Sequence, residues 1–103
     1  MRVDFYGIYR PLVGTKSIEV ESGRSVRQVL DVVTARYPAL RVELLDERGQ
    51  LYPWVPMYVN GRNPRLWDDG LDRPTKAEDV LSIFSPIASG RLNVEDIQKA
   101  SAS

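Results

Sequence analysis

Residues 17–37 read SIEVESGRSVRQVLDVVTARY, and this stretch decides the fold. Its first five residues alternate polar and apolar side chains, which is typical of a strand with one buried face. After a break at residues 22–24, Ser25 and Gln28 have the spacing of a capping box, in which each side chain satisfies a free backbone donor at a helix start. Apolar residues then recur at helical spacing and form one stripe, which consists of Val26, Val29, Leu30, Val33 and Tyr37. The sequence therefore predicts a strand followed closely by an amphipathic helix.

The segments that flank this stretch extend the pattern on both sides. Residues 3–9 are rich in β-branched and aromatic types and predict a first strand with a kink at Gly7. Residues 11–14 predict a turn, so the first strand and residues 17–21 are expected to form a hairpin. The helix is expected to end at Pro38, because a proline pushes the residue before it out of the α region.

Beyond the helix, the chain alternates between short apolar segments and turns. Residues 40–45 fit either a helical turn or a strand, and residues 46–49 fit a turn. Alternation at residues 55–59 predicts a strand that ends in a tight turn at Asn60-Gly61. A long loop and a second turn at residues 76–79 lead to a last strand at residues 80–84, in which Leu81 and Ile83 are the inward pair.

This order of elements predicts one fold class. A hairpin crossed by a helix and closed by a strand that returns beside the first strand gives a mixed sheet with the helix on one face. The predicted class is α+β, a ubiquitin-like β-grasp with four to five strands packed on one main helix. We place this domain at residues 1–88 and a flexible C-terminal tail at residues 89–103, in which residues 92–97 also fit a short helix.

Composition excludes several classes of function. The chain has 103 residues, with 14 basic and 14 acidic side chains, so no overall field attracts nucleic acid or anionic lipid. It contains neither cysteine nor histidine, which removes thiolate nucleophiles, the commonest general base and the commonest zinc ligands. Asp68, Asp69 and Asp72 lack the alternating spacing of a calcium loop and are expected to be solvated. We therefore expect a protein that is not an enzyme and that carries no metal and no cofactor.

The sequence also bears on location. No apolar run approaches the roughly 18–20 residues that span a bilayer. Asp4 lies where a signal peptide would keep its apolar stretch. We expect a cytoplasmic protein without a membrane partner.

Four segments carry a resemblance to a known family. They read YRPLVGT at residues 9–15, YVNGRN at residues 58–63, GLDRP at residues 70–74 and DVLSIFSPIASG at residues 79–90. In this order and at these distances they resemble the small sulfur-carrier family of MoaD and ThiS, which includes the small subunit of molybdopterin synthase. The resemblance covers roughly residues 2–90.

The resemblance implies a chemistry and a set of partners. In this family an E1-like adenylyltransferase of the MoeB or ThiF type uses ATP to adenylate a terminal Gly-Gly, and a sulfur donor then displaces AMP to leave a thiocarboxylate. The matching tail here is Ala88, Ser89 and Gly90, with Gly90 as the adenylated residue. Glycine suits a tail that must thread a narrow active site, because it has no side chain. A sulfur-accepting enzyme subunit is the second implied partner.

This sequence departs from the family at the tail and in one loop. Ser89-Gly90 stands where Gly-Gly is expected, and thirteen residues follow Gly90, so a carrier of this kind requires a protease that cuts after Gly90. Thr75 stands where the family usually has an apolar residue. Two alternatives stay open: a ubiquitin-like interaction module with an intact tail, for which Ser89-Gly90 is a linker, and a protein modifier that conjugates to lysines through Gly90.

Partner-binding residues are expected on the face of the sheet that the helix leaves open. The candidates are Trp54, Tyr58, Phe84 and Ile87, and the alternative is that they cover a minor core under the long loop. Arg62 precedes Arg65 and Arg73, with Trp67 between them. Basic and aromatic interleaving can bind nucleic acid, but the neutral net charge and the nearby aspartates favour an acidic protein surface or a solvated loop.

Overall fold

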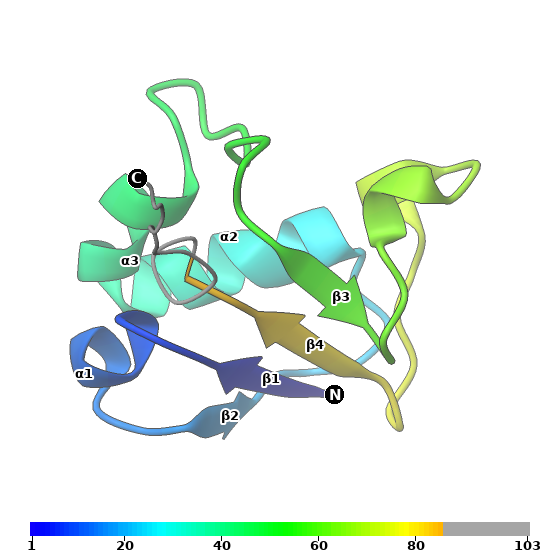
Figure 1. Cartoon of the computed structure of the whole chain (residues 1–103). Helices are drawn as coiled ribbons and strands as arrows, with labels where there is room; N and C mark the ends of the chain where they lie inside the picture. The colour runs from blue at the N-terminus through cyan, green and yellow to red at the C-terminus, as the bar shows by residue number, and fades with distance from the viewer. Residues whose placement is uncertain (86–103) are drawn as a thin grey trace, which may run out of the picture.

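The computed structural model describes residues 1–85 and contains a four-stranded mixed sheet with helices on one face (Figure 1). The strand order is β2-β1-β4-β3, with bounds β1 Arg2–Phe5, β2 Ser17–Glu19, β3 Met57–Val59 and β4 Val80–Ile83. β1 pairs antiparallel with β2 and parallel with β4, and β3 pairs antiparallel with β4. The expected α+β, ubiquitin-like β-grasp is therefore confirmed. The predicted tail at residues 89–103 lies outside the described residues.

The main helix, α2 (Val26–Arg36), begins and ends where the sequence indicates. The Gln28 N–H donates to Ser25 Oγ at 3.1 Å, and the Ser25 N–H donates to Gln28 Oε1 at 2.9 Å, which completes the capping box. Tyr37 adopts a φ of −128° and ends the helix before Pro38. A further helix, α3 (Pro38–Leu44), begins at the proline and decides between the two alternatives for residues 40–45. Proline is favoured there because the first helical N–H has no partner anyway.

The prediction for residues 3–14 was wrong in part. β1 ends at Phe5, and the expected turn is the short helix α1 (Tyr9–Val13), which Gly14 ends with a φ of 84°. Tyr9, the first residue of α1, is only 1% exposed, so the burial of its ring holds this short helix against the core. A five-residue helix is too short to show helical periodicity, and tertiary burial, not local propensity, stabilises it.

The core lies between the sheet and the helices α2 and α3. Apolar residues of the strands and of the predicted helical stripe are buried: Val3, Phe5, Ile18, Val20, Val26, Val29, Leu30, Val33, Met57, Val59, Leu81 and Ile83. Tyr37, the last residue of the stripe, is only partly buried. Met1, Tyr9, Leu40, Leu44, Leu45 and Val55 complete the cluster. Burial, together with the nearby Glu43 carboxylate, raises the pKa of Tyr9 to about 12.

The loop between β3 and β4 is fixed by local bonds. Asn60 and Gly61 have φ of 52° and 81°, the pair of positive values that a tight hairpin turn requires. Two short 3-10 turns follow, η1 (Pro64–Leu66) and η2 (Gly70–Asp72). Thr75 is buried, and both its N–H and its Oγ1 donate to the carbonyl of Arg24, at 2.8 and 2.7 Å. The hydroxyl at this family-atypical position is therefore satisfied.

None of the helices in residues 1–85 has the length and apolar character needed to cross a membrane.

Candidate functional site

The candidate site is the end of β4, where the chain leaves the sheet towards residue 90. Ile83 lies between Phe5 of β1 and Met57 of β3. Two further backbone bonds extend the pairing, from the Tyr6 N–H to the Ile83 carbonyl at 3.1 Å and from the Phe84 N–H to the Pro56 carbonyl at 2.9 Å. Because β4 is a central strand that pairs with both neighbours, its backbone is fixed by hydrogen bonds as far as Phe84.

Three rings gather beside this exit and are called here the aromatic cluster: Tyr6, Tyr58 and Phe84. Phe84 stacks on Tyr6 with 4.4 Å between ring centroids and meets the edge of Tyr58 at 5.8 Å. Strand alternation predicts that Tyr58 and Phe84 lie opposite the buried face, and the structure confirms this placement. Tyr58 is 37% exposed. Aromatic pairs in such geometries stabilise a fold by roughly 0.5–1.5 kcal/mol each, in addition to the free energy gained by burying their apolar surface. The three rings therefore hold one another in a defined arrangement.

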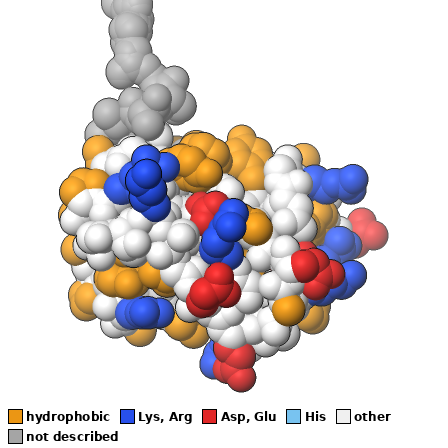
Figure 2. All heavy atoms as spheres, turned by 90° about the horizontal axis from the view of Figure 1, so that it is seen from below, with side chains coloured by type: hydrophobic (Ala, Val, Ile, Leu, Met, Phe, Trp, Pro, Cys, Tyr) orange, Lys and Arg blue, Asp and Glu red, His pale blue; other side chains and the backbone are white. Residues whose placement is uncertain are grey.

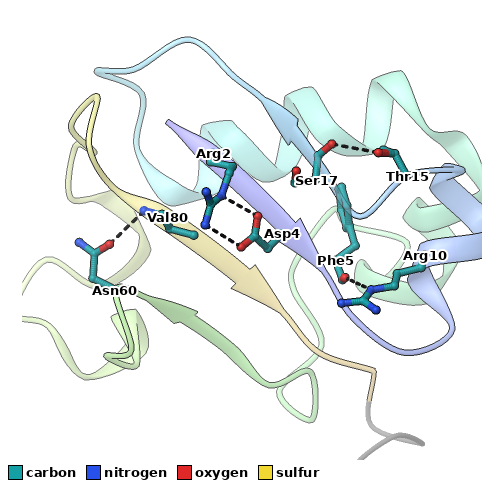
Figure 3. A network of polar contacts seen from close by, with 8 residues as sticks. All are labelled: Arg2, Asp4, Phe5, Arg10, Thr15, Ser17, Asn60 and Val80. Atoms are coloured by element: carbon teal, nitrogen blue, oxygen red, sulfur yellow. Dashed lines mark hydrogen bonds and ion pairs between the residues drawn. The ribbon is translucent and has the colours of Figure 1, made fainter.

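Arg10 holds a positive charge at the edge of this cluster. Its Nε donates to the Phe5 carbonyl at 2.7 Å, and its guanidinium carbon lies 5.0 Å from the centroid of the Tyr6 ring. Figure 3 shows the side chain reaching from α1 back to the end of β1. Figure 2 shows hydrophobic side chains along the upper edge of the molecule with basic atoms beside them. A guanidinium that lies above an aromatic ring is attracted by the negative face of the ring, so this cation–π contact helps to hold Arg10 in place.

The sequence analysis missed Tyr6 and Arg10. Tyr6 directly follows the buried Phe5 along the strand, so alternation could have placed its side chain on the open face. Arg10 lies in the segment YRPLVGT, which was used only for the family resemblance.

The structure separates the other predicted partner residues. Trp54 is 59% exposed and stacks on Tyr52, with 4.4 Å between centroids. Arg62 follows the hairpin turn after Val59, at the opposite end of β3 from Pro56, so it is not beside Phe84. Ile87, Ala88, Ser89 and Gly90 lie outside the described residues. Partner binding by Trp54, Arg62 and Ile87 stays a prediction, as do the tail role of Ala88 and Ser89 and the adenylation of Gly90.

The remaining charged candidates form hydrogen bonds or ion pairs within the fold. Arg65 donates from Nη1 to the Val55 carbonyl at 2.8 Å and from Nη2 to the Tyr52 carbonyl at 2.9 Å, and burial lowers its pKa from the usual value. Arg65 therefore fixes the backbone of residues 52–55 through these two hydrogen bonds. Asp69 pairs with Arg73 and Asp72 with Arg27, each at 2.9 Å. Within residues 1–85, no group of three or more acidic side chains is placed to hold a metal ion.

The fold, and a central strand that leads directly to the family-like tail, define a small ubiquitin-like protein of the sulfur-carrier and modifier kind. The model described as the ThiS family matches residues 3–90, and the chain belongs to this family.

Individual relatives agree with this assignment. Small archaeal modifier protein 1 of Haloferax volcanii is 28% identical over 76 residues, which are 74% of this chain and 82% of that protein. The solution structure of small archaeal modifier protein 1 from Methanosarcina acetivorans is similar with a TM-score of 0.72 and 29% identity, covering 86% of this chain and 94% of that one. The crystal structure of the Amycolatopsis orientalis BexX/CysO complex is similar with a TM-score of 0.71 and 30% identity. The match covers 86% of this chain and 98% of that one.

Proposed function

We propose that this protein is a sulfur carrier in which Gly90 is adenylated by an E1-like adenylyltransferase of the MoeB or ThiF type. The observation that carries the proposal is the extent of the family match, which stops at residue 90, thirteen residues before Ser103. This end point supports Gly90 as the residue that would be activated. The rigid exit at Ile83 and Phe84 supports the proposal, because a carrier must present a tail from a stable base.

The chemistry needs no catalytic group from this chain. A carboxylate oxygen of Gly90 attacks the α-phosphorus of ATP, and pyrophosphate leaves. Hydrosulfide then attacks the acyl carbon and AMP leaves, and loss of the remaining proton gives the thiocarboxylate. Reacting atoms must approach to roughly 3–3.5 Å, and the enzyme provides that alignment. The absence of His and Cys from the sequence is compatible with a protein that is a substrate and not an enzyme.

Removal of residues 91–103 must come first. With Arg91 attached, the Gly90 carbonyl belongs to an amide, which is neutral and a poor nucleophile. A protease that hydrolyses the Gly90–Arg91 bond is therefore a required partner.

The aromatic cluster and Arg10 are the proposed contact surface for the activating enzyme or for a sulfur-accepting subunit. Half-exposed aromatic rings and arginine are the residue types that dominate binding energy at interfaces. Their position beside the exit of β4 would place a bound enzyme close to the tail. The CysO structure that resembles this chain is in a complex with BexX, which supports a partner enzyme in general.

Conjugation is the second candidate function, because two of the relatives are named small archaeal modifier protein 1. It starts from the same adenylate, but a lysine amine attacks the acyl carbon in place of sulfur, so an isopeptide bond forms as AMP leaves.

Intact-mass analysis of protein isolated from its native host tests the processing step. We expect a form that ends at Gly90, and a mass increase of one oxygen-to-sulfur exchange on part of it identifies the carrier. Gly90 found in isopeptide linkage to other proteins favours the modifier. If only forms that extend past Gly90 are present, the proposal is wrong and an interaction module with an intact tail replaces it.

A further inference from the structure

A groove of about 530 Å³ lies at the end of the sheet opposite the tail exit. It lies between the hairpin turn after β3, the loop that contains η1 and η2, and the turn before β4. In Figure 1 these segments are at the right, whereas β4 runs to the left towards its exit. Its lining residues are Val59, Asn60, Arg62, Trp67, Arg73, Pro74, Lys76 and Asp79. The groove is therefore separate from the aromatic cluster.

The charge around the groove is predominantly positive. Arg62, Arg73 and Lys76 line it together with one carboxylate, Asp79, and Arg73 is already paired with Asp69 at 2.9 Å. Both oxygens of Asp79 already accept hydrogen bonds, from Asn60 Nδ2 at 2.9 Å and from the Lys76 N–H at 2.8 Å. Within residues 1–85, the side chains of Arg62 and Lys76 are exposed and have no acidic partner. Arg62 and Lys76 are therefore the two lining cations that are available to an acidic ligand.

The apolar part of the lining limits what can bind. Trp67 and Pro74 provide nonpolar surface between the cations, whereas Val59 belongs to the core and is only 3% exposed. The guanidinium carbon of Arg73 lies 4.6 Å from the Trp67 ring centroid, so one face of the indole is already covered and is closed to a nucleobase. Asp68, Asp69 and Glu78 flank the groove in sequence and would repel a long polyanion. A short segment presents fewer negative charges to these carboxylates than a nucleic acid strand does.

We propose that this groove binds an acidic peptide segment of a partner protein, with an apolar side chain against Trp67 and Pro74 and flanking carboxylates on Arg62 and Lys76. Arg–carboxylate contacts are charge-assisted and directional, which suits a specificity site. The site does not depend on Gly90 chemistry. The groove lies at the opposite end of β4 from the tail. A partner protein bound in the groove therefore leaves the aromatic cluster free for a second partner.

The test uses the full-length, ¹⁵N-labelled protein and the probe peptide acetyl-Asp-Glu-Leu-Asp-Glu-amide. We expect amide shift changes that concentrate in residues 59–62 and 67–79, with a dissociation constant in the millimolar range or tighter, about −4 kcal/mol. The double variant Arg62→Glu/Lys76→Glu should weaken binding by about tenfold or more. Lys16→Glu/Arg48→Glu makes the same charge change at exposed residues elsewhere and should change binding less than twofold, a difference on the order of 0.4 kcal/mol.

Several results would overturn the proposal. They are the absence of shift changes with the peptide, shift changes centred on the aromatic cluster, and equal weakening by the two double variants. A single-stranded DNA oligonucleotide that shifts the same amides more strongly than the peptide would assign the groove to nucleic acid instead. The spectrum of each free variant shows directly whether it is folded, so a loss of binding through unfolding is recognised as such.

Discussion

The two ends of β4 have different chemistry, although one strand connects them. At its first residue, polar side chains satisfy one another: the Val80 N–H donates to Asn60 Oδ1 at 3.0 Å, and Asn60 in turn donates to Asp79. Directly after its last residue, Ile83, the ring of Phe84 packs between two partly exposed tyrosine rings. The first end presents cations around a groove, and the second presents an apolar surface beside the exit. A substitution at one end should therefore leave the function of the other unchanged.

The largest effect is expected from the core that supports both ends. Leu30 is 2% exposed on α2, and Leu30→Ala should lower the free energy of unfolding by roughly 2–5 kcal/mol through lost burial and a residual cavity. The urea midpoint measures this loss. Asp31→Ala, an exposed change on the same helix, is the matched control. Equal midpoints for the two variants would show that the assigned core face is wrong.

The next effect separates the two ends directly. In a form that ends at Gly90, Phe84→Ala should raise the KM for the carrier in adenylation by about tenfold, or 1.4 kcal/mol, with kcat nearly unchanged, because the cluster contributes to binding and not to chemistry. Steady-state ATP–pyrophosphate exchange gives both constants. Arg62→Ala, at the other end, should leave the KM unchanged. A comparable rise with Arg62→Ala would contradict the separation of the two surfaces.

Alkaline pH tests the attachment of α1, which carries Arg10. The pKa of Tyr9 is raised to about 12 in the fold, whereas an unfolded tyrosine titrates near about 10. Since the fold disfavours the phenolate, the stability contribution is complete below pH ~10 and is lost as the pH rises towards 12. Urea midpoints should fall over this interval, and Tyr9→Phe should make the fall shallower. An identical pH slope in Tyr9→Phe would show that Tyr9 is not the group responsible.

The smallest effect concerns the start of α2, which bridges to Pro74 at the groove end. Ser25→Ala removes the acceptor for the Gln28 N–H and should cost about 1 kcal/mol. Ser22→Ala is a nearby exposed control. Thermal unfolding that does not distinguish the two would mean that the capping bond contributes nothing measurable.

Elements with local signals could be predicted from the sequence. The Ser25 and Gln28 pair, the stripe from Val26 to Val33 and the Asn60-Gly61 turn each carry their own physical cause, and each is present in the structure. Helix α1 carries no such signal, because the burial of Tyr9 against distant residues holds it in place.

The site was predictable only in part, for a related reason. Alternation placed Tyr58 and Phe84 on the open face of the sheet. It does not give the register between two strands, so it cannot show which residues of β3 and β4 lie side by side. The β3–β4 register pairs Met57 with Ile83 and Val59 with Leu81, and this pairing puts Arg62 and Phe84 at opposite ends. Arg10 was missed because its position depends on a hydrogen bond to the end of β1, which exists only once α1 has formed.

The most direct test of the account is ATP–pyrophosphate exchange with the host's own E1-like enzyme on three proteins. They are the full-length chain, a form that ends at Gly90, and that shorter form with Gly90→Val. The account predicts exchange with the form that ends at Gly90 alone, because the full-length chain has an amide in place of the carboxylate and a branched side chain cannot follow glycine into a narrow channel. If the form that ends at Gly90 is as inactive as the full-length chain, Gly90 is not the activated residue and the carrier proposal is contradicted.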